Sequence, residues 1–190
     1  MIIMVLGLII FFAVHSLSIV NYQLRNQLAN QYGEAAFKGL YSLASLIGLV
    51  LIIWGYGQAR LSPTVIFVPP FWLKHVTMLL MLPFFILFLA TYFQGKIKTI
   101  FKHPMLVSIK LWALAHLLSN GMLHDLILFV SFLAWAVVDR ISMKKRPADP
   151  VPTASFNKND VIAIVGGLIL YFVFALWIHV WLIGVAPMAR

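Results

Sequence analysis

The sequence predicts an all-α integral membrane protein, a polytopic bundle of about six transmembrane helices with almost no soluble part. Of its 190 residues, 63% are hydrophobic and 10% are charged, whereas a soluble domain is about half apolar and a quarter charged. Several apolar runs approach the roughly 20 residues that a helix needs to cross a hydrocarbon core ~30 Å thick. The length suits one bundle, so we expect a single domain over residues 1–190.

Six apolar runs are the predicted spans, and polar or proline-containing loops separate them: Met1–Val20, Gly39–Gly57, His75–Phe93, Pro104–Leu118, Met122–Ile141 and Val161–Val185. The fourth is the shortest, at about 15 residues or ~22 Å. A turn signal, Ser119-Asn120-Gly121, joins it to the fifth, so these two helices should form a tight antiparallel hairpin. We expect that turn to be buried, with Gly121 at positive φ. Residues 143–160 are predicted to be a cytoplasmic linker before the last helix.

The distribution of lysine and arginine predicts the orientation. Ten of these residues lie in the loops after the first, third and fifth helices, while three lie in the other loops and at the C-terminus. The richer side is cytoplasmic, so both termini should lie outside. The net charge of +9 belongs to these loops and forms no stripe with interleaved aromatics, so we expect no nucleic-acid partner.

Few side chains within the spans could carry acid–base chemistry. Four of the five acids lie in loops or at helix ends, and only Asp125, at the start of helix five, could reach an intramembrane cavity. The sequence has no cysteine, which excludes disulfides, iron–sulfur clusters, thiolate-ligated haem and thiol nucleophiles. It also has no HExxH, GxSxG or Walker motif, so intramembrane proteolysis and ATP hydrolysis lack their parts.

Histidine is the polar residue that the spans do contain. His15 lies deep in helix one and His116 in helix four, where ionisable groups are costly and commonly functional. For both, two interpretations stay open: a ligand, or a buried histidine hydrogen-bonded to a neighbouring helix. His179 lies between Trp177 and Trp181, which favours a place in an aromatic belt near the outer interface.

Helix four carries two polar stripes. His103 and Lys110 are seven residues apart and share one helical face, which predicts an anion or substrate mouth at the cytoplasmic end. Snorkelling of Lys110 to the interface is the alternative. His116 stacks with Trp112 at i−4 and Asn120 at i+4, which predicts a pocket further inside.

Histidines on different helices of a bundle are the arrangement that holds a b-type haem without cysteine. Neutral imidazole is a good iron ligand, and the surrounding Phe, Trp, Leu and Ile side chains suit an apolar macrocycle. Haem b is therefore the expected cofactor.

Several motifs carry a resemblance to a known family. They are Phe37-Lys38-Gly39-Leu40-Tyr41-Ser42, Pro69-Pro70-Phe71-Trp72, His103-Pro104-Met105-Leu106, the run from Leu111 to Gly121, and the run from Phe132 to Arg140. Together they resemble the NnrU family of bacterial inner-membrane proteins, over nearly the whole chain. That family is associated with denitrification and nitrogen-oxide metabolism.

The NnrU family is related to zeta-carotene isomerase, a haem b membrane enzyme. On that resemblance, the axial histidines of the isomerase fall on His15 and His116. The isomerase has a cysteine three residues before its second histidine, whereas this chain has Ala113. Ligand exchange through that thiolate is therefore absent here.

A second, partial resemblance is to isoprenylcysteine carboxyl methyltransferases, whose Arg-His-Pro motif helps to hold S-adenosylmethionine. Here Lys102 precedes His103-Pro104, and Leu106 and Ser108 replace the expected tyrosine and glycine. The paired glutamates expected after the hairpin are missing too. These departures argue against a methyl-transfer site.

Three functions stay open from the sequence. The first is a haem b-binding membrane protein of NnrU type, acting in nitrogen-oxide or related redox metabolism. The second is a membrane enzyme on a lipophilic substrate, either a polyene isomerase or a methyltransferase. The third is a haem-free accessory that assembles a reductase. The expected partners are membrane lipids and a redox or reductase partner in the membrane.

Overall fold

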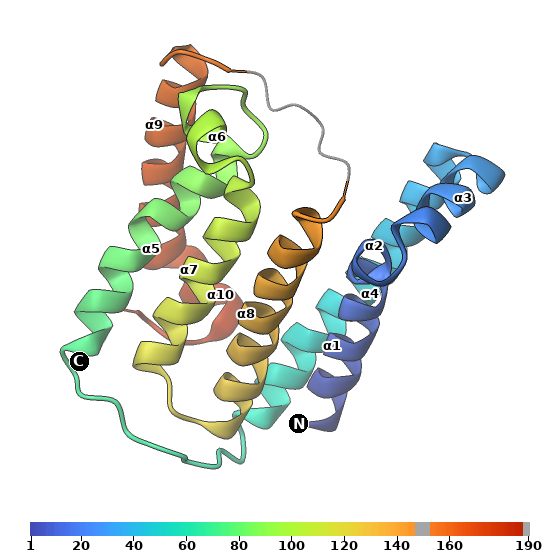
Figure 1. Ribbon diagram of the computed structural model, residues 1–190. Helices are drawn as coiled ribbons and strands as arrows, with labels where there is room; N and C mark the ends of the chain where they lie inside the picture. The colour runs from blue at the N-terminus through green and yellow to red at the C-terminus, as the bar shows by residue number, and fades with distance from the viewer. Residues whose placement is uncertain (147–152, 188–190) are drawn as a thin grey trace. The chain divides into compact units, whose positions relative to one another are not determined.

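The computed structural model describes residues 1–146 and 153–187, which are helical apart from short loops and one isolated β-bridge (Figure 1). The all-α prediction is confirmed. The chain divides into two compact units, residues 1–64 with 137–146 and residues 65–136 with 153–187. Residues 147–152 of the predicted linker lie outside the described residues, as do residues 188–190.

Within the described residues, four helical stretches are long and apolar enough to cross a membrane. They are α4 (Glu34–Ala59), α5 (Leu73–Ala90), α8 (Leu123–Met143) and the stretch Lys158–Ile183. Two further apolar helices are shorter, α1 (Ile2–His15) and α7 (Pro104–Ser119). Of the six expected spans, four therefore correspond to helices of spanning length and two to shorter helices, so the count of six stays a prediction.

Glycine contacts hold α1 against α4 in the first unit. A methyl group on Gly7 would come within 2.6 Å of Ile52 N, and one on Gly48 within 2.9 Å of Phe11 N. A methyl group on Gly55 would come within 2.6 Å of Met4 Cα. The paired positions run in opposite directions, so the helices are antiparallel. Small residues let the backbones approach closely, which is how helices associate where lipid is as apolar as leucine.

The polar stretch after α1 is more helical than expected. Past a break at Ser16, α2 (Leu17–Val20) leads into α3 (Tyr22–Tyr32). Asn21 caps α3 by accepting a hydrogen bond of 2.8 Å from Leu24 N, and Gly33 ends it at φ 83°. Helix α4 starts five residues before the expected Gly39, because Glu34, Ala35, Ala36 and Lys38 are good helix formers, while the two charged residues lower the hydropathy of this turn.

In the second unit, α5 packs against both α7 and α9 (Lys158–Val173). The Thr77 hydroxyl on α5 donates to the Ala115 carbonyl on α7 over 2.7 Å. A methyl group on Gly167 of α9 would lie 2.7 Å from Ile86 N on α5. These contacts place α5 between the two other helices.

A short helix that the sequence did not predict, α6 (Lys96–Phe101), follows α5. The Asp160 side chain of α9 accepts hydrogen bonds from Lys96 N over 3.0 Å and Ile97 N over 2.8 Å. It also accepts one from Asn157 N over 3.0 Å, completing a capping box at the start of α9. One buried carboxylate therefore caps two helices, and the cap on α6 comes from more than 60 residues further along the chain.

The last helical stretch contains a wide turn. Helix α9 passes into a π-helical segment, η1 (Phe174–Ile178), and then α10 (His179–Ile183). Gly184 ends the stretch in the left-handed conformation at φ 74°. The sequence predicts one uninterrupted helix over Val161–Val185. In the structure the helical stretch runs from Lys158 to Ile183 and contains the π-helical segment near its end.

The α1–α4 contact predicts opposite outcomes for two glycines on one helix. Gly55→Ala forces α1 away from α4, whereas Gly57 has open space around its missing side chain. Overpacking of this kind costs about 1–3 kcal/mol, while alanine at an open helical position stabilises by roughly 0.5–1 kcal/mol. Thermal unfolding in detergent should show a lower midpoint for Gly55→Ala and an unchanged or higher one for Gly57→Ala. Equal midpoints would contradict the close packing of these helices.

Candidate functional site

His15 is the last residue of α1, and its ring lies among aromatic side chains. Its Nδ1 donates to the Phe11 carbonyl over 2.7 Å. The ring stacks on Phe11 with centroids 3.9 Å apart and contacts Tyr41 of α4 at 5.0 Å. The histidine is therefore held by its own helix and by α4.

A charged pair lies in the same unit as this histidine. Arg146 donates to Asp139 Oδ1 over 2.8 Å, and both side chains are largely buried. The Arg146 guanidinium also lies over the Tyr22 ring, 5.9 Å from its centroid. The sequence predicts Asp139 only as an acid at a helix end, and its ion pair with Arg146 was not predicted.

His116 lies on the α7–α8 hairpin in the second unit. Its Nδ1 donates to the Trp112 carbonyl over 2.8 Å. The imidazole stacks on Phe129 of α8 with centroids 4.7 Å apart, and the Trp112 ring meets both Phe129 and Phe132 edge-on. Trp112 thus contacts the His116 ring at 5.5 Å, as its i−4 spacing predicted. Asn120 does not contact the imidazole through a hydrogen bond: its side-chain nitrogen donates to the His116 carbonyl over 2.8 Å and to the Ser119 hydroxyl over 3.2 Å.

The turn that holds this hairpin is pinned by residues 65–67. Ile66 N and Phe67 N both donate to the Gly121 carbonyl, over 2.9 and 3.2 Å, and a β-bridge joins Val65 to Met122. Gly121 is buried, as expected. The expected positive φ is wrong, because Gly33 and Gly184 are the glycines of the described chain with positive φ. Glycine fits here for another reason, since a methyl group would meet the Phe67 carbonyl.

The predicted mouth of His103 and Lys110 has an unusual backbone at its start. His103 is the N-cap of α7 with non-helical angles, φ −128° and ψ 67°. Helical phase therefore does not set its side-chain direction, and a face shared with Lys110 stays a prediction. Lys102 has φ 58° and lies at the centre of a γ-turn, because His103 N donates to the Phe101 carbonyl over 2.6 Å.

Asp125 and His179 both have structural roles. Asp125 is buried, lies 3.5 Å from His124 Nε2 and accepts a hydrogen bond of 3.3 Å from Met122 N at the start of α8. His179 donates from Nδ1 to the Val185 carbonyl over 2.7 Å, which the left-handed Gly184 makes possible by turning the chain back.

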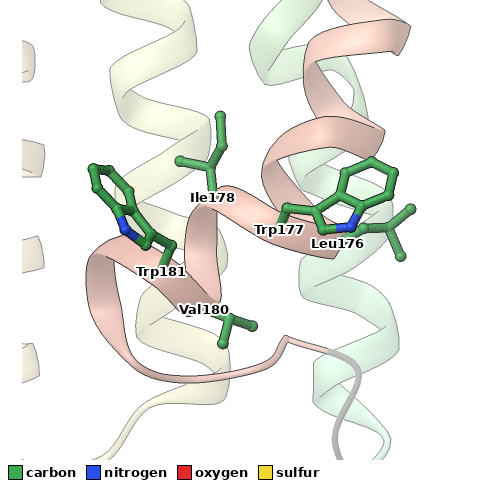
Figure 2. Close-up of a pocket in the computed structure, with 5 residues that line it drawn as sticks. All are labelled: Leu176, Trp177, Ile178, Val180 and Trp181. Carbon is green, nitrogen blue, oxygen red and sulfur yellow. The ribbon is translucent and has the colours of Figure 1, made fainter.

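Apolar side chains of η1 and α10 line a hollow of about 600 Å³. Figure 2 shows its five lining side chains, with the indoles of Trp177 and Trp181 on opposite sides of the ribbon. Trp177 is 64% exposed and Trp181 84%, in keeping with the aromatic belt expected around His179. The hollow opens widely and contains no polar side chain among its lining residues.

The two intramembrane histidines share one local geometry. In each, Nδ1 bonds the backbone carbonyl four residues earlier. A carbonyl can only accept, so Nδ1 carries the proton and the neutral ring has its lone pair on Nε2. Metal-bound histidines are commonly oriented in this way, by donating their other nitrogen to a carbonyl. Both side chains are thus in the tautomer that a ligand requires.

Residues 3–187 match the family model described as NnrU protein. The chain belongs to the NnrU family. No curated protein and no solved structure matches it. The family match confirms the resemblance found in the sequence motifs. It agrees with the apolar helices in indicating a multi-pass membrane protein of a bacterial family.

The hairpin geometry predicts that Gly121→Ala loosens the turn beside His116. The added methyl group would push the Phe67 carbonyl away and weaken two hydrogen bonds from residues 66 and 67. Limited proteolysis should cut residues 61–72 faster in this variant. Gly39→Ala is the control, because nothing lies within 4 Å of a methyl group there. Equal cleavage rates in both variants would show that residues 65–67 do not pin the turn.

Proposed function

We propose that this NnrU family member binds haem b through His15 and His116 and acts in nitrogen-oxide or related redox metabolism. The observation that carries the proposal is the pair of Nδ1–carbonyl hydrogen bonds, 2.7 Å at His15 and 2.8 Å at His116. These bonds leave Nε2 of each neutral ring as the nitrogen with the lone pair, the form that binds iron. The metabolic role rests on the resemblance to the family.

The surroundings of each histidine suit an apolar macrocycle. Phe11 and Tyr41 lie against His15, while Trp112, Phe129 and Phe132 surround His116. In the described residues, no group of three or more His, Cys, Asp or Glu side chains could hold a bare metal ion. Haem needs fewer protein ligands, because the porphyrin fills the equatorial positions and leaves the axial ones to imidazole.

When bound, haem supplies an iron that accepts and releases single electrons at a potential set by its axial ligands and their hydrogen bonds. The part of this chain is to hold the two imidazoles and to keep water away from them. The carbonyls of Phe11 and Trp112 fix the ring orientations. Arg146 and Asp139 form a compensated ion pair in the unit that contains His15.

Spectroscopy of detergent-purified protein tests the proposal. We expect a Soret band, a b-type pyridine haemochrome and one haem per chain. His15→Ala and His116→Ala should each remove the bis-imidazole spectrum, because each takes away one of the two axial ligands of the same iron. His103→Ala is the control, since His103 is the N-cap of α7, at the opposite end of that helix from His116. Its spectrum should be unchanged.

The haem-to-protein ratio separates the possible outcomes. His15 is the last residue of α1, whereas His116 lies near the α7–α8 turn. A shared iron requires both side chains to reach the same depth in the membrane. Two haems per chain, with one lost in each variant, would contradict the shared iron. A wild-type protein without a Soret band would contradict haem binding itself and favour the accessory function.

We also propose an inner-membrane location with both termini in the periplasm. The support is the bias of ten basic residues against three, read by the positive-inside rule. Reporters fused after Lys98 and after Arg146 should both report the cytoplasm. A periplasmic signal from either fusion would show that α7 or α8 crosses in the opposite sense.

A further inference from the structure

A short helix covers the end of the second unit where α5 ends and α7 and α9 begin. Asp160 at the start of α9 holds the first two backbone amides of α6, and Lys98 Nζ donates to the Thr91 carbonyl at the end of α5 over 2.8 Å. Figure 1 shows α6 and the start of α9 together at this end. Because α5 and α9 have the length and hydropathy of membrane spans, their ends mark the membrane surface, and α6 lies there.

The exposed charge at this end of the second unit is positive. Lys96 and Lys102 on α6 and its flank are exposed, and so is Lys158 on the first turn of α9. The acid among them, Asp160, is 1% exposed and has its oxygens occupied by three backbone amides. The other described acid of this unit, Asp125, starts α8 at the opposite end of α7. The exposed lysines therefore have no surface carboxylate of this unit, in its described part, to neutralise them.

Large apolar side chains are also exposed in the segments that carry these lysines or adjoin them. Tyr92 is 66% exposed, Ile100 62%, Phe101 41% and Phe156 57%. Apolar side chains beside lysines are typical of segments that lie in the membrane interface, where rings and alkyl groups enter the acyl boundary and ammonium groups meet headgroups. We call these four residues, with Lys96, Lys102 and Lys158, the lysine face.

The backbone fixes one of these lysines. Lys102 N donates to the Lys98 carbonyl over 2.8 Å, and the next amide closes the γ-turn at φ 58°. A non-glycine residue in this region is strained, and such strain persists where the surrounding structure requires it. The turn stops α6 at Phe101 and starts α7 at Pro104 within three residues, so Lys102 is kept at the same end as Lys96.

We propose that the lysine face binds the phosphate headgroups of anionic phospholipids and anchors this end of the second unit to one leaflet. Charge complementarity identifies the partner, since three exposed ammonium groups face a surface that carries negative lipids. The exposed aromatic and aliphatic side chains favour a lipid surface over a soluble acidic protein, because they need an apolar phase that only the bilayer provides.

Lipid retention by the full-length protein tests the proposal. The protein in detergent is incubated with phosphatidylglycerol or phosphatidylcholine and analysed by native mass spectrometry. The wild type should retain phosphatidylglycerol preferentially. Each lysine near an anionic surface contributes about fivefold in affinity, so Lys96→Gln, Lys102→Gln and Lys158→Gln combined should weaken retention by on the order of 100-fold. Exposed positions such as these tolerate substitution, and thermal unfolding confirms that the variant folds.

Matched variants and a competing ligand sharpen the result. Arg60→Gln with Lys74→Gln removes basic charge from the other loops and should leave retention unchanged. Ile100→Ser with Phe101→Ser should weaken retention of both lipids, because the apolar anchor is lost. Equal retention of the two lipids by the wild type would overturn the proposal, as would an equal loss in the control variant. Tighter binding of an acidic peptide than of phosphatidylglycerol vesicles would overturn it in favour of a protein partner.

Discussion

Hydrocarbon offers no hydrogen-bond partner, so each polar group of this chain that enters it must find one within the protein. The backbone amides and carbonyls meet this requirement through the hydrogen bonds of the helices. Polar side chains within the apolar helices follow the same rule, because Ser45 and Ser131 each donate to the carbonyl four residues before them. His15 and His116 do likewise, and the tautomer that suits iron is a by-product of this local solution. The proposed cofactor chemistry thus depends on how a membrane helix accommodates polarity.

Where the helix is interrupted, the same constraint explains what covers the gap. At the α7–α8 turn, residues 65–67 supply two amides to the Gly121 carbonyl and a bridge to Met122. At the opposite end, one carboxylate satisfies amides from two helices. Both sets of hydrogen bonds join segments that are far apart in the sequence. They fix the ends of α7, which carries His116 near one end and follows Lys102 at the other.

Hydropathy was sufficient for the long elements, since the expected third and fifth spans match α5 and α8 to within three residues. Hydropathy did not predict α3 or α6. Helix α3 depends on a side-chain cap from Asn21, and α6 depends on Asp160, which lies more than 60 residues further along the chain. The pairing of Trp112 with His116 followed from helical spacing. The stacking of Phe129 on His116 did not, because it depends on the register between two helices. The joint use of His15 and His116 stays a prediction.

The close fit of α1 on α4 has a consequence for how the protein is made. Helix α1 has 14 residues and therefore a length of about 21 Å, short of a hydrocarbon core of ~30 Å. Its glycine contacts leave no room for a lipid chain between it and α4. During synthesis α1 thus emerges before the surface that holds it in place. Because α1 gains these contacts only after α4 has been synthesised, we expect the two helices to enter the bilayer as a pair.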